Sequence, residues 1–587
     1  MPSTMAMVLK SMAATTCDLC LFSHFGVDGS PRVHFKTRDV GIRAVNRGLS
    51  TNRKTLKRRL GINIRAIVQE NLERSKRTDA YPLGLDVVSE GELREKGFMG
   101  LRKTKLVCTI GPACCALEDL EKLALGGMNV ARLNMCHGTR EWHLDVISKI
   151  KKLKRERNFS ISVMIDTEGS QIHVVDHGAP SSVKVEDGSI WLFTAEQSKS
   201  YRPFTVQASF EGFSEGTEVG DELVIDGGMA CFVVVEKTGS DLHCKCTDPG
   251  LFLPGAKFSF WRNGKLVRRN YKLSTLSTKD WADIDFGVSA EVDYFALSFV
   301  NDTDSIRHLK KYLSTKTAKP IKVLAKIESL ESLYNLEDIV QASDGIMVAR
   351  GDLGVEIPLE QIPIVQESIT CISRHLNKPV IVASQLLESM VEYPTPTRAE
   401  VADVSEAVRQ YADALMLSGE SAIGSYGQKA LAVLDMASSR MESWSRAENR
   451  QTHLNTRQLG LSLPDRIAEQ ICNCAVEMAN NLGVDAIFVF TRHGHMASLL
   501  SRNRPNPPIF AFTSDNNTRM ALNLQWGVVP LLVDLSDDAE SNILKSIGLM
   551  KSKGLIRQGD MVLVVSDVTP TPTTPLSLQS LQVKAII

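Results

Sequence analysis

From residue 101 onward the chain alternates short apolar runs with amphipathic stretches, and this alternation limits the possible fold more than any other feature. Nearly all of the runs end in polar or glycine residues, which is typical of parallel strands that alternate with helices. The eight runs are Lys105–Gly111, Asn129–Asn134, Ile161–Asp166, Asp293–Phe299, Ile321–Glu328, Gly345–Gly351, Pro379–Ser384 and Asp413–Gly419. Eight βα units favour a closed (β/α)8 barrel with its active site at the C-terminal ends of the strands. An open sheet would also accommodate eight strands.

Two segments differ from this pattern and predict further domains. Residues 176–275, between the third and fourth runs, are rich in Val, Gly and Asp and contain repeated turn signals, so we expect a small all-β domain inserted in a barrel loop. After Trp444 the chain becomes polar, which indicates a linker. Residues 464–587 restart an α/β pattern and predict an open, mainly parallel sheet. The barrel itself would comprise residues 100–175 and 276–445.

The N-terminal segment carries a positive charge that the net charge of the whole chain does not reveal. The whole chain has 68 Lys and Arg against 68 Asp and Glu, yet residues 1–60 hold 11 Lys and Arg, three Asp and no Glu. This segment is rich in Ser and Thr and lacks the apolar centre of a secretory signal, which is typical of an organelle transit peptide. We expect residues 1–75 to be a transit peptide and disordered lead; a basic tail that binds a polyanion is the alternative. Cys17 and Cys20 have metal-ligand spacing, but no second pair follows.

Composition excludes several classes of protein. No apolar run approaches the ~18 residues that span a bilayer, so we expect no membrane partner. A net charge of zero argues against a dedicated nucleic-acid binder, which would carry a basic excess. The 12 cysteines are scattered along the chain, which fits thiols in a reducing compartment better than a disulfide scaffold.

The strongest chemical signal lies on the fifth apolar run. Side chains alternate along a strand, so Lys326 and Glu328 point to the same face. Inside an apolar strand such a pair is costly unless the two serve each other or a ligand. If Asp352 at the end of the next strand converges on Glu328, two carboxylates would offer oxygen ligands suited to Mg²⁺. Lys326 would then neutralise charge on a transferring group. The alternative is an internal ion pair between Lys326 and Glu328.

Three other strand ends carry residues suited to ions. Arg132 can hold a carboxylate or phosphate in bidentate fashion, or it can pair with a structural acid. Asp166 and Thr167 end the third run and, with Asn134, form an oxygen-rich corner able to hold a cation. Gly351–Gly354 stands before an expected helix and offers free backbone N–H groups to an anion.

Several segments match the motifs of one family. They are Lys105–Pro112, Gly127–Asn134, Ala325–Glu328, Ala342–Pro358, Gln385–Met390, Pro396–Glu400 and Met416–Ala422. With these motifs the chain resembles the pyruvate kinase family over roughly residues 102–585, in particular its plastidial branch in plants, and the run ASDGIMVARGDLGVEIP is close to diagnostic. The resemblance implies a TIM barrel, an inserted small β-barrel lid domain and a C-terminal α/β domain.

The resemblance also implies an activity and its partners. The expected reaction is phosphoryl transfer from phosphoenolpyruvate to ADP, which gives pyruvate and ATP, with Mg²⁺ (or Mn²⁺) and K⁺ as cofactors. In such a reaction positioning and charge neutralisation supply most of the acceleration. We expect the protein to work in the plastid stroma, as an oligomer that contains another plastidial pyruvate kinase subunit.

Residue roles follow from the same resemblance. Lys326 would stabilise the transition state, and Arg132 would bind the transferring phosphate. Glu328 and Asp352 would bind Mg²⁺, while the backbone at Gly351 and Asp352 would anchor the substrate carboxylate.

Other family positions extend this assignment. Asn134, Asp166 and Thr167 would hold K⁺. Ser384 stands where the family usually has Thr, beside the substrate carbon that is protonated when pyruvate forms. Asp226 matches the lid residue that closes on the site.

Four positions depart from the family pattern. Cys136 replaces a hydroxyl that ligates K⁺, and a thiol is a poor ligand for a hard cation. Gln171 replaces a nearby Glu, Glu168 replaces a Lys, and His173 replaces an Arg near the nucleotide phosphates. We therefore expect weakened K⁺ dependence and weaker nucleotide handling.

These departures leave alternatives open. The chain is either an active pyruvate kinase or a catalytically weakened regulatory subunit of a heteromeric enzyme. A third alternative is another barrel enzyme that acts on phosphoenolpyruvate.

Overall fold

The computed structural model describes most of the chain from residue 102 to residue 587. The gaps lie at residues 170–173, 177–182, 197–202, 226–229, 253–255, 268–274, 449–457, 461, 537 and 569–577. The expectations for residues 1–75, Cys17, Cys20, Gln171, His173 and Asp226 therefore lie outside the described residues. Among the helices that are described, none combines the length and the apolar composition that crossing a bilayer requires.

Eight parallel strands close into a barrel in the order β1-β18-β17-β16-β15-β14-β3-β2. The strands are β1 (Lys105–Thr109), β2 (Val130–Asn134), β3 (Ser162–Asp166), β14 (Tyr294–Leu297), β15 (Lys322–Ile327), β16 (Gly345–Ala349), β17 (Val380–Ala383) and β18 (Ala414–Leu417). Each lies within one of the eight runs predicted from the sequence. The closed barrel is therefore confirmed, and the open-sheet alternative is excluded.

The barrel strands are buried on both faces, which explains why they are almost continuously apolar. One set of side chains fills the interior, among them Val107, Met164 and Leu324. The alternate set, among them Leu106, Ile165 and Val323, packs between the strands and the surrounding helices. A packed interior leaves the strand ends and their loops as the place for polar chemistry.

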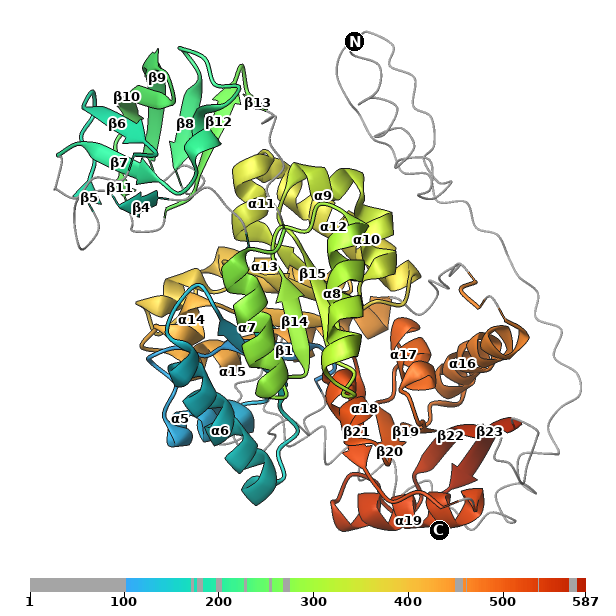
Figure 1. The fold of residues 1–587 in the computed structure, drawn as a ribbon. Helices are drawn as coiled ribbons and strands as arrows, with labels where there is room; N and C mark the ends of the chain where they lie inside the picture. Colours follow the sequence, from blue (N-terminus) through green and yellow to red (C-terminus); the bar gives the residue numbers. More distant parts are fainter. Residues whose placement is uncertain are drawn as a thin grey trace, which may run out of the picture. The chain divides into compact units, whose positions relative to one another are not determined.

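Helices surround the barrel strands (Figure 1). They are α5 (Leu117–Leu125), α6 (Arg140–Arg157), α7 (Thr278–Ser289), α8 (Thr303–Lys316), α9 (Leu330–Tyr334), α10 (Leu336–Ala342), α11 (Arg350–Glu356), η3 (Leu359–Gln361), α12 (Ile362–His375), η4 (Glu388–Val391), α13 (Arg398–Arg409), α14 (Gly419–Ala422) and α15 (Gly427–Glu448). Helix α15 continues past Trp444 to Glu448, so the start of the predicted linker is helical.

Between β3 and α7 the chain forms the expected all-β domain. Its sheet has the order β13-β12-β8-β9-β10-β6-β7-β4, and β5 pairs with β11. The strands are β4 (Val174–Asp176), β5 (Val183–Lys184), β6 (Ile190–Thr194), β7 (Thr205–Ala208), β8 (Glu222–Ile225), β9 (Ala230–Thr238), β10 (Asp241–Asp248), β11 (Leu251–Phe252), β12 (Phe258–Arg262) and β13 (Lys265–Leu266), with the short helix η2 (Glu211–Ser214). Alternate inward side chains such as Phe193, Phe232 and Leu242 form a separate core.

The C-terminal domain is an open sheet in the order β21-β20-β19-β22-β23. Its elements are α16 (Leu463–Leu482), β19 (Ala486–Phe490), α17 (His495–Arg502), β20 (Ile509–Thr513), α18 (Asn516–Ala521), η5 (Leu522–Leu524), β21 (Val528–Leu532), α19 (Ala539–Ser552), β22 (Met561–Val568) and β23 (Leu578–Ala585). Four strands are parallel, as predicted, and β23 is antiparallel to β22. Helices α16 and α17 cover one face of the sheet and α19 the other (Figure 1).

Candidate active site

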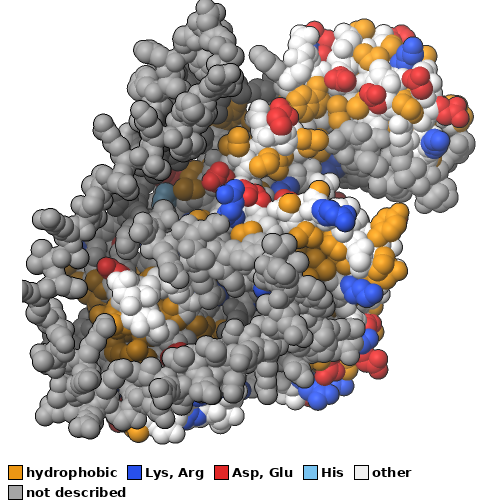
Figure 2. All heavy atoms as spheres, turned by 180° about the vertical axis from the view of Figure 1, so that it is seen from behind, with side chains coloured by type: hydrophobic (Ala, Val, Ile, Leu, Met, Phe, Trp, Pro, Cys, Tyr) orange, Lys and Arg blue, Asp and Glu red, His pale blue; other side chains and the backbone are white. Residues whose placement is uncertain are grey.

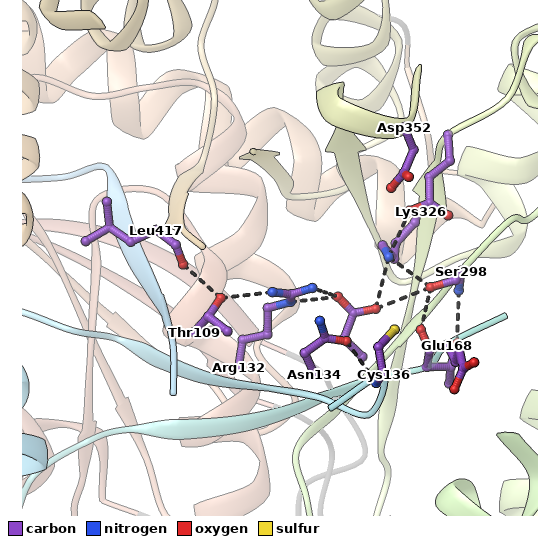
Figure 3. Close-up of polar contacts among 12 residues, drawn as sticks. Thr109, Arg132, Asn134, Cys136, Glu168, Ser298, Lys326, Asp352 and Leu417 are labelled. Carbon is purple, nitrogen blue, oxygen red and sulfur yellow. Dashed lines mark hydrogen bonds and ion pairs between the residues drawn. The ribbon is translucent and has the colours of Figure 1, made fainter. Parts of the chain in front are cut away.

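Polar side chains gather around the ammonium group of Lys326 at the C-terminal ends of the barrel strands (Figure 3). The Lys326 Nζ donates to Ser298 Oγ at 2.8 Å and lies 3.1 Å from Asp166 Oδ1 and 2.8 Å from Glu328 Oε1. Lys326 is only 8% exposed, and both carboxylates are almost fully buried. The ion pair of Lys326 with Glu328, which was the alternative to a catalytic role, is thus present, together with a second acid.

The charges of this cluster favour the protonated form of Lys326 and the ionised form of Asp166. Burial by itself lowers the pKa of Lys326, but the charges of Asp166, Glu328 and Asp352 outweigh it, so the pKa lies above its usual value. Burial likewise raises the pKa of Asp166, yet the positive charges of Lys326 and Arg132 bring it below the ordinary range. A permanently charged ammonium group therefore stands at the end of β15.

Arg132, at the end of β2, pairs with Asp166. Its Nε donates to Asp166 Oδ2 at 2.7 Å, and its Nη2 lies 2.6 Å from the same oxygen. A third nitrogen, Nη1, donates to Thr109 Oγ1 at 2.9 Å, and that hydroxyl donates to Leu417 O at 2.8 Å (Figure 3). Pairing with an acid was the alternative that the sequence left open for Arg132.

Glu328 and Asp352 form a second acidic pair beside Lys326. Glu328 Oε2 accepts from the backbone N–H of Phe299 at 2.7 Å, and the Lys257 ammonium of the β domain bonds Asp352. Burial raises the pKa of Glu328 to about 7, and the charge of Asp352 acts in the same direction. Burial also raises the pKa of Asp352, but Lys257 and Lys326 together bring it below the usual range.

This pair of carboxylates fits a divalent cation. The carboxylate charges of Glu328 and Asp352 repel each other in a buried place, and a doubly charged ion between them would relieve that repulsion. Among the described residues no group of three or more His, Cys, Asp or Glu side chains could hold a metal ion. Two carboxylates leave several positions for substrate oxygens and water, which is how Mg²⁺ is commonly bound in phosphoryl-transfer sites.

Gly351 and Ser384 lie side by side next to this acidic pair. A Cβ atom placed on Gly351 would stand 3.6 Å from Ser384 Cβ. Helix α11 begins at Arg350, so Gly351 lies inside its first turn rather than before the helix as expected. Its N–H is still one of those that an α-helix leaves free. Ser384 follows β17 with a φ of 71°, and its carbonyl accepts from Arg350 Nη2 at 2.6 Å.

The oxygen-rich corner predicted at the ends of β2 and β3 is also present. The strand register places Asn134 opposite Asp166. Ser298 links this corner to Lys326, because its Oγ donates to Thr167 O at 2.6 Å and its backbone N–H donates to Thr167 Oγ1 at 3.1 Å. Asn134 Oδ1 accepts from the backbone N–H of Cys136 at 3.2 Å. The oxygens expected to hold a cation are thus already engaged by protein donors.

Cys136 is exposed as a residue, and its thiol faces the acidic corner (Figure 3). Loss of water around the thiol, and then the charge of Asp166, raise its pKa to about 11. The thiol is therefore protonated at neutral pH and offers little to a hard cation.

Glu168 is neutralised by a residue that the sequence did not single out. The Lys279 ammonium, near the start of α7, forms an ion pair with Glu168 and also donates to Met135 O at 2.7 Å. Asp280, the next residue, accepts from the backbone N–H groups of Glu168 and Gly169 at 3.0 and 3.2 Å. The negative charge expected at this position is therefore compensated.

A cavity of about 270 Å³ adjoins this ion pair. It is lined by Met135, Gly138, Thr139, Arg140, Glu141, Lys279 and Asp283. Two of the residues that line the cavity are cationic. Arg140 donates from Nε to Asp283 Oδ1 at 2.7 Å, and Lys279 is paired with Glu168.

Four residues of the site were missed by the sequence reasoning: Ser298, Lys257, Lys279 and Asp280. Ser298 lies inside the fourth apolar run and directly follows β14, so its position at a strand end was a usable signal. Lys279 and Asp280 belong to the start of a helix after the inserted domain, and Lys257 belongs to the inserted domain itself. Their approach to the site depends on tertiary structure.

On the face drawn in Figure 2, the Lys and Arg side chains of the described residues are interspersed with acidic and hydrophobic ones and form no single basic patch. This distribution contrasts with the continuous basic stripe by which nucleic-acid-binding surfaces are recognised.

Comparison with known proteins finds two matching family domains. Residues 101–431 match the barrel domain of pyruvate kinase, and residues 469–574 match its alpha/beta domain.

Individual relatives show the same similarity. The chain is 57% identical over 509 residues to pyruvate kinase isozyme A, chloroplastic, of Ricinus communis, with 86% of each chain covered. It is 56% identical to the enzyme of the same name from Nicotiana tabacum, with 86% of this chain and 84% of the relative covered. Among solved structures, a pyruvate kinase from Cryptosporidium parvum superposes with a TM-score of 0.71 at 28% identity, over 85% of this chain and 98% of that one.

Proposed function

The chain belongs to the pyruvate kinase family and transfers a phosphoryl group from phosphoenolpyruvate to ADP, and we propose that the cluster around Lys326 carries out this transfer. The observation that supports the assignment most directly is the convergence of one buried ammonium group with three carboxylates at the strand ends. Such a cluster holds fixed charge where a phosphoryl group would gain negative charge.

Lys326 acts on the transferring phosphoryl group. Its ammonium remains protonated because Asp166 and Glu328 surround it, so the charge is in place before the substrates arrive. A fixed charge in a buried site needs no reorganisation during the reaction. Arg132 supplies a second cation at the neighbouring strand end and binds the phosphate while it keeps its contact with Asp166.

Glu328 and Asp352 hold Mg²⁺ or Mn²⁺ together with substrate oxygens. Bound there, the metal ion supplies charge neutralisation between the phosphoryl donor and acceptor. The free N–H groups of Gly351 and Asp352 in the first turn of α11 bind the substrate carboxylate. The hydroxyl of Ser384, beside Gly351, stands next to the carbon of enolpyruvate that receives a proton. Asp226, outside the described residues, is the proposed lid residue.

Asn134, Asp166 and Thr167 form the proposed K⁺ site, with Cys136 at a doubtful fourth position. The occupied state of these oxygens and the protonated Cys136 thiol support the expectation of a weakened K⁺ dependence.

The alternative of a catalytically weakened regulatory subunit is not favoured. Lys326, Glu328 and Asp352 are all present and converge, and the substituted Glu168 is paired with Lys279 rather than exposed as a free negative charge. The high identity to two proteins named pyruvate kinase isozyme A agrees with an active enzyme.

We also propose that the protein works in plastids with a second type of subunit. The basic, acid-poor segment 1–75 and the chloroplastic names of its relatives support import into the plastid. The heteromer is tested by purifying the chain alone and together with another plastidial pyruvate kinase chain. Co-elution and a higher turnover of the mixture would support it, and independent elution with additive activity would contradict it.

The catalytic assignment is tested by Lys326→Met. We expect kcat for pyruvate formation to fall by about 10³-fold or more, because the removed charge acts mainly in the transition state. Phosphoenolpyruvate binding, measured by calorimetry, should change little.

The matched control is Lys322→Met, the same change at the opposite end of strand β15. Thermal melting of both variants establishes that they are folded. Turnover of Lys326→Met equal to that of the parent would show that Lys326 is not the catalytic cation.

A further inference from the structure

Three arginine side chains gather where the barrel meets the C-terminal domain, away from the site described above. Arg374 lies near the end of α12, Arg502 ends α17, and Arg504 follows shortly after. Arg374 and Arg502 are 8% and 4% exposed, and the side chain of Arg504 is 7% exposed. We propose that this cluster binds one small inorganic anion of about the size of chloride.

Arg374 is a buried cation without a carboxylate partner. Its Nε donates to the carbonyl of Arg502 at 2.9 Å, and its guanidinium lies 4.2 Å from the ring centre of Tyr411. No carboxylate of the described residues lies within ion-pair distance of it. Arg502, by contrast, is paired with Glu469 at 2.8 Å. Tyr411 and the charge of Asp413 favour the charged form of Arg374, but they do not outweigh its burial and the charge of Arg504.

Arg504 contributes an unused donor. Its Nη2 donates to Tyr411 O at 2.7 Å, and its Nη1 lies 2.9 Å from Asp413 Oδ1. The Nε and the Nη1 are both buried, and neither has a hydrogen-bond partner among the described residues, although Nη1 lies at ion-pair distance from Asp413. The other oxygen of Asp413 accepts from the backbone N–H of Val380 at 2.9 Å. Asp413 is thus contacted on both oxygens, and it acts on Arg374 only through its charge at longer range.

A small cavity lies between these side chains. Four of its lining residues are cationic (Arg374, Lys378, Arg502 and Arg504), whereas Asp413 is its one acidic lining residue among those described. The space available is about 10 Å³, which corresponds to a single occupant of roughly the size of a water molecule. The size excludes a nucleotide or a sugar phosphate, and the excess of positive charge favours an anion over water.

Burial, and then the charge of Arg504, lower the pKa of Arg374 to about 9, which shows that its charged form is disfavoured where it stands. A buried charge is stable only when it is paired. An anion between Arg374 and Arg504 would pair with both. Because Arg374 belongs to the barrel and Arg504 to the C-terminal domain, the same ion would hold the two domains together.

Crystals of the full chain soaked in sodium bromide give the direct test. Bromide is slightly larger than chloride and scatters anomalously, so we expect an anomalous peak between Arg374 and Arg504. A peak elsewhere only, or none, would overturn the proposal and assign the cavity to water.

An anion that binds only the folded protein raises its melting temperature, and this effect can be measured in solution. In potassium chloride, compared with potassium gluconate at equal ionic strength, the melting temperature should rise saturably by about 2 °C or more, because gluconate is too large for the cavity. Arg374→Gln should lose this increment, whereas Arg307→Gln, the same change at an exposed arginine of α8, should keep it. An equal increment in the parent and in Arg374→Gln would contradict the proposal even if the variant is less stable.

Discussion

The charged residues of the site form ion pairs, and the effect of a substitution on activity depends on the partner that it leaves unpaired. Arg132 and Lys326 share Asp166, Lys257 holds Asp352, and Lys279 holds Glu168. A charge that is already paired exerts a weaker field on a substrate than a free one. The substitution of a family Lys by Glu168 therefore affects the site mainly through Lys279, whose ammonium it occupies.

Replacing Glu168 with Gln should release Lys279 and remove one negative charge beside the 270 Å³ cavity. We expect KM for ADP to fall by about 3- to 10-fold, since ADP carries the polyphosphate that a free ammonium would attract. Both side chains are partly exposed, so the effect should shrink when an inert salt screens the charges. Steady-state kinetics at fixed K⁺, with and without tetramethylammonium chloride, measures both quantities.

The control for this change is Glu118→Gln, at an exposed position of α5. An unchanged KM for ADP in Glu168→Gln at low salt would show that the ion pair with Lys279 has no influence on the nucleotide.

Cys136→Ser restores a hydroxyl at the corner formed by Asn134 and Asp166. Because the thiol has a pKa of about 11 and is protonated at neutral pH, we expect the parent to respond weakly to K⁺ and the variant to respond more strongly. A K⁺ titration of activity at constant ionic strength measures the difference. Cys371→Ser, at an exposed position of α12, serves as the control. Strong saturable activation of the parent, equal to that of the variant, would refute the idea.

At this scale the sequence predicted the residue types well and their pairings poorly. Lys326 and Glu328 are two positions apart on one strand, so alternation placed them on one face. Lys279 is 111 residues from Glu168, and nothing local in the sequence brings the two together. Arg132 and Lys326 both form the structural ion pairs that the sequence analysis gave as alternatives, with Asp166 and Glu328 respectively. Buried charges need such partners whether or not a substrate is bound.

At the scale of elements, helix α7 is tied to the loop after β3 by one carboxylate. Asp280 Oδ2 accepts from the N–H and Oγ of Ser277 at 2.8 Å each, which completes a capping box, while Oδ1 accepts from the N–H groups of Glu168 and Gly169. Asp280 is completely buried. A single side chain therefore positions both Lys279 on the helix and Thr167 at the strand end.

Asp280→Ala should consequently destabilise the barrel and impair activity together. Each buried N–H group left without an acceptor costs about 1–3 kcal/mol, so the melting temperature should drop by several degrees. KM for ADP should rise as well, because the loop that carries Glu168 loses its anchor. Differential scanning calorimetry and steady-state kinetics measure the two effects.

Ser277→Ala offers the comparison, because it removes the helix cap alone and leaves the contacts of Asp280 with the loop. We expect it to lower stability by about 1 kcal/mol with little effect on KM. Equal kinetic defects in Ser277→Ala and Asp280→Ala would show that the loop contact is unimportant.

Most elements could be predicted because their periodicity is strong. All eight barrel strands lie in the predicted runs, since strands buried on both faces are continuously apolar. Strand β23 (Leu578–Ala585) was missed, because apolar and polar residues alternate only in its second half, and it has a single β-branched and no aromatic residue. The polar residues after Trp444 were interpreted as a linker, but α15 continues through them to Glu448.

At the scale of the whole molecule, buried polar groups join the barrel to the C-terminal domain. Tyr294 of β14 donates its hydroxyl to the carbonyl of Met520, and Ser162 of β3 does the same at 2.8 Å. Lys105, the first residue of β1, donates to the carbonyl of Val528. The sequence predicted the two domains but not this interface, because polar side chains at the N-terminal ends of strands carry no periodic signal.

Lys105 makes this interface sensitive to pH. Burial, and then the charge of Arg102, lower its pKa from 10.5 to about 7. Between these values the unfolded chain carries a proton that the folded chain does not, so the stability contributed by this group rises with pH from about 7 toward 10.5 and is lowest below 7. The slope can reach about 1.4 kcal/mol per pH unit.

Lys105→Met removes this dependence. We expect the melting temperature of the parent to gain on that of Lys105→Met as the pH rises from 7 to 9, whatever the offset between them at pH 7. Only the slope of the difference reports the titration, because the variant also loses the hydrogen bond to Val528. Lys152→Met, at an exposed position of α6, should instead run parallel to the parent over the same range. A constant difference between the parent and Lys105→Met from pH 7 to 9 would mean that Lys105 stays charged in the folded protein, so that its neighbours Glu442 and Asp413 compensate its burial.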